Sequence, residues 1–134
     1  MSRDDETGAI AAATYFLRDL YAYTERTQDT ARWVAMSHPD CVFCKSVLDD
    51  IAEQRSASHI AVVAPIRFRS TSVDFVSPLM FSVTAEISTG PDQDFAMDGT
   101  FLGASTEDSG TATIIVIRRD NAWLTRGVEL SRHA

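Results

Sequence analysis

The sequence is poor in the residues that most often carry chemistry or bind nucleic acid. Its 134 residues include two cysteines, three histidines and a single lysine, and the formal net charge is −7. Binding to a phosphate backbone depends on clustered lysine and arginine, so this charge argues against a nucleic-acid partner. Neither the glycine pattern of a nucleophile elbow nor a phosphate-binding loop is present, so the sequence indicates neither that type of hydrolase nor a nucleotide-binding protein.

Long apolar segments are also lacking. No run of about 18 apolar residues occurs, so no transmembrane helix is expected. The first residues, MSRDDETG, have neither the basic nor the apolar region of a signal peptide. The remaining composition, 45% hydrophobic and 23% charged, is that of a folded globular chain. We expect one domain over residues 1–134, with residues 1–7 as a disordered tail.

The N-terminal half has the period of helices. Apolar residues recur at three- and four-residue steps over residues 8–25, which predicts a long amphipathic helix. Its expected apolar stripe consists of Ala9, Ala13, Phe16, Leu20 and Tyr23. Glu25 is expected on the opposite, polar face. A short second helix over residues 31–36 and a third helix, running from an Asp40 N-cap to residue 55, complete this half.

The C-terminal half has the period of strands. After residue 59 the apolar residues alternate, and β-branched and aromatic types dominate. The clearest strand has one apolar face, made of Leu79, Phe81, Val83, Ala85 and Ile87. Residues 111–119 are apolar on both faces, which predicts a central strand, and Asp120-Asn121 predicts a tight turn into a last strand. A further strand is expected within residues 95–104, because a bare loop there would be unusually long.

Three helices followed by five or six antiparallel strands predict an α+β domain. The helices must cover their apolar stripes, so we expect them to pack on a single curved antiparallel sheet. A cone-like sheet with the long N-terminal helix across its mouth satisfies this requirement.

This order of elements resembles the nuclear-transport-factor-two-like (cystatin-like) cone, the fold of ketosteroid isomerase and of many small binding domains. The long aromatic helix, the TQDT segment at residues 27–30 and the SHPDCVFC segment at residues 37–44 more narrowly resemble an uncharacterised family of actinobacterial lipoprotein domains. In that family a similar S-x-P-x-C-x-x-C segment opens a helix, and no activity is established. The resemblance implies an extracytoplasmic domain on an N-terminal lipid anchor that lies outside this sequence. If Met1 is the natural start, the cytoplasm is expected instead.

Cys41 and Cys44 form the one local motif with a chemical meaning, and four interpretations are open. A disulfide is the simplest, because no cysteine is left over; closing its four-residue loop contributes roughly 2 kcal/mol. A redox C-x-x-C site at a helix N-terminus is the second, although such sites normally follow a strand. A zinc site with His38 and the distant His59 is the third, and it lacks a second ligand pair. Two reduced thiols packed as small apolar side chains are the fourth.

Three carboxylates and two arginines are further candidates. Asp49, Asp50 and Asp74 could each act as a general base in a pocket, and Arg67 and Arg69 could hold an anion. Each role requires an inward-facing side chain. Charges on a helix and on an outer strand face are more often solvated, which is the competing interpretation.

Four aromatic residues could line a pocket between the helices and the sheet: Tyr15, Tyr23, Trp33 and Phe43. Packing in the core is their commoner role. The histidines, including His133 near the C-terminus, have no evident partner in the sequence.

Three functions therefore remain open. The first is a non-catalytic, extracytoplasmic binding or accessory domain of a lipoprotein. The second is a small-molecule enzyme of the ketosteroid-isomerase or dehydratase type, in which a pocket aspartate acts as general base. The third is a protein-partner module that uses the exposed face of the sheet. The expected partner is a small ligand, a protein or a second copy of the chain, and neither a metal nor a cofactor is expected.

Overall fold

The computed structural model describes residues 4–132 of the chain. Its helical elements are α1 (Glu6–Thr14), the π-helical segment η1 (Tyr15–Leu20), α2 (Tyr21–Thr27), α3 (Ala31–Ala35) and α4 (Val42–Ser56). The first three form one continuous helix. It begins inside the segment expected to be a tail, because the Asp5 carboxylate accepts a hydrogen bond from the Gly8 N–H and caps the helix. Residues 1–3 of that expected tail lie outside the described residues.

Seven strands follow the helices: β1 (His59–Val62), β2 (Arg67–Ser77), β3 (Met80–Thr89), β4 (Gln93–Ala96), β5 (Phe101–Ala104), β6 (Asp108–Arg119) and β7 (Ala122–Arg132). They form two antiparallel sheets, ordered β2-β3-β6-β7 and β1-β4-β5. The α+β class is confirmed, and the prediction of one sheet with five or six strands is wrong. Proline donates no ladder hydrogen bond, and Pro65 and Pro91 stand where β1 leads into β2 and β3 into β4.

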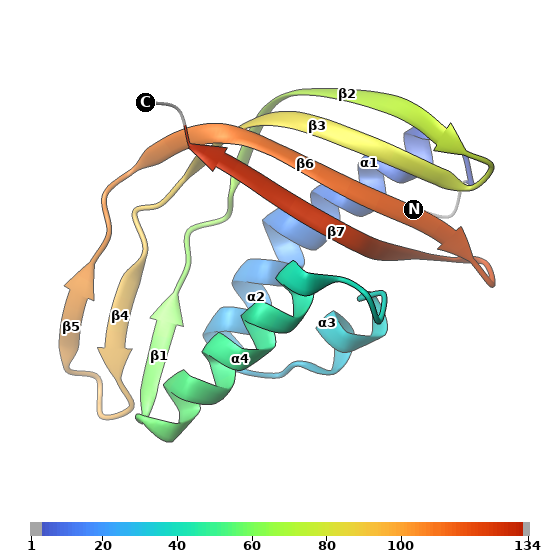
Figure 1. Cartoon of the computed structure of the whole chain (residues 1–134). Coiled ribbons are helices and arrows are strands. Elements are labelled where there is room, and N and C mark those ends of the chain that lie inside the picture. The colour runs from blue at the N-terminus through green and yellow to red at the C-terminus, as the bar shows by residue number, and fades with distance from the viewer. Residues whose placement is uncertain (1–3, 133–134) are drawn as a thin grey trace.

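The strands form a curved wall around the helices. Figure 1 shows the four long strands arching over α1, while the short strands β1, β4 and β5 stand at one end of the arch. The helix α4 lies beside α2 and close to β1 (Figure 1). This arrangement agrees with the expected helices on the concave side of antiparallel strands.

Small residues on α1 allow the helix to lie close to the long sheet. Ala9 and Ala13 are fully buried in one core cluster with Val83 on β3 and Ile114 on β6. Burial alternates along β3, as predicted from residue 81 onward. Leu79 departs from the prediction: it is 44% exposed, because it lies in the β2–β3 turn with a φ of 68°.

The C-terminal hairpin forms as the sequence predicts. The strand β6 is central, between β3 and β7. Asp120 and Asn121 have φ values of 53° and 63°, and they connect β6 to β7 in a tight turn.

The π-helical segment changes which side of the long helix is buried. A π turn contains more residues than an α turn, so it rotates the positions that follow it. From η1 onward, the buried positions are Phe16, Leu17, Leu20, Thr24, Glu25 and Gln28. The predicted roles of two residues are consequently reversed. Tyr23 is 42% exposed, whereas Glu25 is only 3% exposed.

Candidate functional site

An open pocket of about 530 Å³ lies between α2, α4 and the three-stranded sheet. Five carboxylates line it: Glu25, Asp50, Glu53, Asp92 and Asp94. The other polar side chains on its wall are Tyr21, Gln54, His59 and Ser105. Within the described part of the chain, no lysine or arginine lines this pocket. We call it the acidic pocket.

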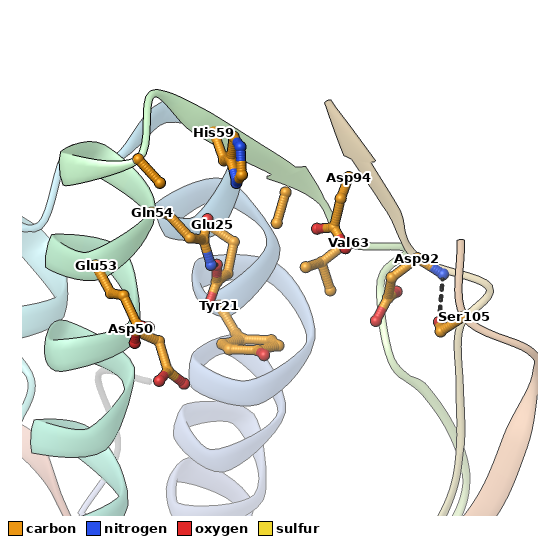
Figure 2. A pocket seen from close by; sticks show the side chains of 12 residues that line it. Tyr21, Glu25, Asp50, Glu53, Gln54, His59, Val63, Asp92, Asp94 and Ser105 are labelled. Atoms are coloured by element: carbon orange, nitrogen blue, oxygen red, sulfur yellow. Dashed lines mark hydrogen bonds between the residues drawn. The ribbon is translucent and has the colours of Figure 1, made fainter. Parts of the chain in front are cut away.

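The carboxylates occupy opposite walls. Figure 2 shows Asp50 and Glu53 on α4, with Asp92 and Asp94 facing them from the strand side. Glu25 lies between these walls and is almost completely buried, whereas the side chains at the mouth reach solvent. A small ligand in the pocket would therefore contact negative charge on several sides.

Each wall is fixed by local structure. Asp50 and Gln54 are four residues apart on α4, so they lie on one helix face. On the strand side, the Ala64 N–H donates to Asp92 Oδ1 at 3.0 Å. The Asp92 N–H donates to Ser105 Oγ at 2.9 Å, the bond drawn in Figure 2. These bonds hold the segment before β4 against the chain entering β2 and leaving β5.

Gln28 ends α2, three residues after Glu25 of the pocket. It is 7% exposed, and its φ of 60° ends the helix. Its side-chain amide donates to the His59 carbonyl at 2.7 Å, and Arg55 Nη2 donates to the Gln28 carbonyl at 2.5 Å. These bonds join α2, α4 and β1, which carry most of the pocket wall.

Glu25 is the buried acid of the pocket. Its Oε2 accepts a hydrogen bond from Gln54 Nε2 at 3.1 Å. Burial is the main cause that raises the pKa of Glu25, and the nearby charges of Asp50, Asp92 and Asp94 raise it further. The hydrogen bond from Gln54 acts in the opposite direction. The net result is a carboxyl group that holds its proton to a higher pH than an exposed glutamate.

Tyr21 lies one helical turn before Glu25 and also lines the pocket. Burial raises the pKa of its phenol, and the charges of Glu25, Asp92 and Asp50 add to the increase. The phenol therefore remains protonated at neutral pH and can donate a hydrogen bond.

A smaller, more apolar cavity of about 210 Å³ lies next to the acidic pocket. Leu17, Phe43 and Ile66 line it. Tyr21 and Val63 line both spaces, so the two cavities share a wall.

Comparison with known proteins relates the chain to others through its fold alone. No protein-family model matches it, and no curated protein matches its sequence. The intermembrane-space region of the chloroplast protein ARC6 is 13% identical, with a TM-score of 0.67, and the match covers 98% of this chain and 99% of that one. A scytalone-dehydratase-like protein from Novosphingobium aromaticivorans is 13% identical, with a TM-score of 0.62 and coverage of 96% and 86%. An uncharacterised protein with a cystatin-like fold from Caulobacter vibrioides is 13% identical, with a TM-score of 0.58 and coverage of 96% and 89%. The chain has this cystatin-like fold.

The aromatic residues named from the sequence lie apart from the acidic pocket. Trp33 is fully buried and stacks on Phe16 with ring centroids 4.0 Å apart. Tyr15 packs partly buried against the same cluster, and Phe43 lines the smaller cavity. Tyr23 is exposed, and its hydroxyl donates to Asp29 at 3.3 Å.

Of the charged candidates, Asp50 alone is in the acidic pocket. Asp49 is exposed on α4, and Asp74 is exposed on β2. Arg67 pairs with Glu107 at 3.1 Å, and Arg69 reaches a backbone carbonyl on β3. The structure does not bring the two arginines together with a carboxylate in a pocket.

The disulfide predicted between Cys41 and Cys44 is confirmed, with an S–S distance of 2.07 Å. Cys41 Sγ accepts a hydrogen bond from the Cys44 N–H, so Cys41 caps α4 and the expected cap, Asp40, does not. The Cα atoms are 5.2 Å apart, and the bond keeps the sulfur over the first helical turn. The Trp33 indole donates to the Cys44 carbonyl at 3.0 Å, which joins this corner to the core.

The disulfide excludes two of the other three interpretations of the motif, the zinc site and the pair of reduced thiols. Both thiols are joined, so the zinc alternative loses two ligands; His38 lies in the turn before α4, and His59 lies on β1. Within residues 4–132, no three His, Cys, Asp or Glu side chains are arranged to hold a metal ion. His133 lies outside the described residues.

The disulfide indicates an oxidising, extracytoplasmic environment, because disulfides are rare in reducing compartments. Among the described residues, none of the helices has the length and apolar character needed to cross a membrane.

Four of the five pocket carboxylates were not identified from the sequence as site residues: Glu25, Glu53, Asp92 and Asp94. No local motif marks them, because they come from three distant segments. A buried glutamate on the long helix could have been suspected only if the π turn had been recognised.

Proposed function

We propose that this domain binds a small organic cation in the acidic pocket, as a non-catalytic binding domain. The observation that carries the proposal is the convergence of five carboxylates on one pocket without a lysine or arginine on its wall. Charges of one sign that surround a cleft concentrate the oppositely charged ligand there. The opposing positions of Asp50 and Asp94 favour a ligand with more than one amine group (Figure 2).

The direct experiment is titration of the purified domain with putrescine and spermidine, using 1,4-butanediol as an uncharged analogue of putrescine. We expect binding of the amines but not of the diol, with weaker binding at high salt. Asp50→Asn should weaken amine binding roughly fivefold, because one charge pair near a protein surface contributes about 1 kcal/mol or more. Asp49→Asn, one residue away and outside the pocket, is the matched control. Equal binding of diol and diamine would contradict the proposal.

A second function has its own supporting observation. Glu25 is a buried carboxyl group with a raised pKa beside the protonated phenol of Tyr21, which is the kind of pair that general acid–base chemistry uses. A scytalone-dehydratase-like protein shares the fold. An enzyme of this type would lose turnover on Glu25→Gln while its KM changed little. A binding domain would show no turnover to lose.

We also propose that the domain acts outside the cytoplasm on a lipid anchor. The disulfide and the resemblance of the SHPDCVFC segment to lipoprotein domains support this location. Metabolic labelling of the natural gene product with an alkyne fatty acid tests it. Absence of label on a protein recovered from the cytoplasm would refute it.

A further inference from the structure

The Glu25–Gln54 pair in the acidic pocket has more hydrogen-bond acceptors than donors. Gln54 Nε2 donates to Glu25 Oε2 at 3.1 Å. Among residues 4–132, Gln54 Oε1 is the one buried side-chain oxygen or nitrogen without a hydrogen-bond partner, whereas Glu25 Oε1, which receives no hydrogen bond, is not such a buried atom. Glu25 itself is only 3% exposed. A buried acceptor without a donor is rare and costly, so Gln54 Oε1 points to a missing donor beside Glu25.

The groups around Glu25 make its ionised form unfavourable. Asp50 and Glu53 face the pocket from α4, and Asp92 and Asp94 face it from the strand side. His59 on β1 and the neutral Tyr21 on α2 complete the titratable groups on the pocket wall. Arg55, the nearby cation on α4, donates to the Gln28 carbonyl.

Two kinds of donor can satisfy the pair. A proton on Glu25 makes the carboxyl neutral and supplies one O–H donor. An ammonium group supplies three N–H donors and a positive charge, so it satisfies both free oxygens and leaves Glu25 ionised. A proton on Glu25 opposes binding of the ammonium group, because a neutral carboxyl offers the cation no negative charge to pair with.

We propose that Glu25 carries a proton in the empty pocket at mildly acidic pH and releases it to solvent when an ammonium group of the ligand takes its place beside Gln54. The inference rests on the proposed function of cation binding. The exchange balances: the O–H bond of Glu25 breaks, the proton passes to the buffer, and a salt bridge between ammonium and carboxylate forms. Binding is therefore tighter at higher pH, by up to about tenfold per pH unit where one proton is displaced.

The test is calorimetric titration of spermidine into the whole domain from pH 5.5 to pH 8, in paired buffers of different ionisation enthalpy. The dependence of heat on buffer gives the number of protons released per ligand. Spermidine amines stay charged throughout, because amines of this type titrate near about 10. We expect more protons to be released per ligand at the acidic end of this range than at the alkaline end. Glu25→Gln should bind with almost no release, and Asp49→Asn should match the wild type.

The outcomes separate the two proposals. Spermidine binding without proton release from the wild type would overturn the proton exchange and leave the binding function in place. No binding of spermidine or putrescine would overturn both. A ligand-free measurement needs no variant: ¹³C NMR titration of the Glu25 carboxyl should give a midpoint above the ordinary value of 4.5. A midpoint at or below that value would also overturn the inference.

Discussion

Replacing Glu25 with glutamine should change how the stability of the protein depends on pH. The amide has nearly the shape of the carboxyl group, carries no charge, and brings an NH₂ that can donate to Gln54 Oε1, the buried acceptor without a partner. In the wild type, ionised Glu25 leaves that acceptor unmet and faces the charges of Asp50, Asp92 and Asp94. We therefore expect Glu25→Gln to be more stable than the wild type wherever Glu25 is ionised.

The sign and the pH window follow from proton binding. The pKa of Glu25 in the folded protein lies above its ordinary value of 4.5, so between these two values the folded state binds more protons than the unfolded state. The free energy of unfolding therefore falls as pH rises through this window. The contribution of Glu25 to the free energy of unfolding is fully present below pH 4.5 and is lost above the raised pKa of Glu25.

The expected difference in the free energy of unfolding comes from Gln54 Oε1, the buried acceptor without a partner. A buried hydrogen-bonding group without a partner costs about 1–3 kcal/mol. The variant should therefore exceed the wild type by about this amount at pH 8, and the two should be nearly equal at pH 4. Urea unfolding followed by the fluorescence of the buried Trp33 and Trp123 measures both free energies at each pH.

The comparison isolates one group, because every other carboxylate is present in both proteins. Asp49→Asn controls for the loss of a charge on α4, and its effect should stay within about 0.5 kcal/mol at every pH. A difference between wild type and Glu25→Gln that did not vary with pH would refute the reasoning. A wild type more stable than the variant at pH 8 would refute it as well.

Three further predictions concern the scaffold. Replacing both Cys41 and Cys44 with alanine should lower the free energy of unfolding by about 2 kcal/mol, from loop closure in a four-residue ring, and the unreduced wild type should take up no alkylating reagent at either thiol. Trp33→Phe should cost about 1–3 kcal/mol in urea unfolding, because it removes the indole donor to the buried Cys44 carbonyl; an unchanged midpoint would mean that this bond is dispensable. Gly110→Ala should destabilise the β6–β7 pairing by about 1–3 kcal/mol, because a Cβ at this position collides with the Ser131 carbonyl, and a variant as stable as the wild type would contradict that contact.

Local pattern in the sequence determined most of the secondary structure. Alternation from Phe81 to Ile87 predicted β3, and Asp120-Asn121 predicted the final turn, because both depend on neighbouring residues alone. A count made the disulfide the simplest of four interpretations, since the chain has two cysteines three positions apart, and the structure confirmed it. The cystatin-like fold was expected from the order of helices and strands, because few arrangements cover three helices with one set of antiparallel strands.

The tertiary structure alone decided the number of sheets. The sequence contains Pro65 and Pro91, but only the fold shows that both fall between the β1–β4 pairing, which ends at Val62 and Gln93, and the β2–β3 pairing, which begins at Arg67 and Ser88. Neither position looks special when the strands are considered one at a time.

The acidic pocket was also decided only in three dimensions. Its carboxylates come from residues 25, 50–53 and 92–94, which no local pattern connects. A single π turn placed Glu25 inside, and tertiary packing put α4 and the short strands around it. The sequence determined that these residues are acidic; the fold determined that one of them is buried among the others, and that burial gives the site its chemistry.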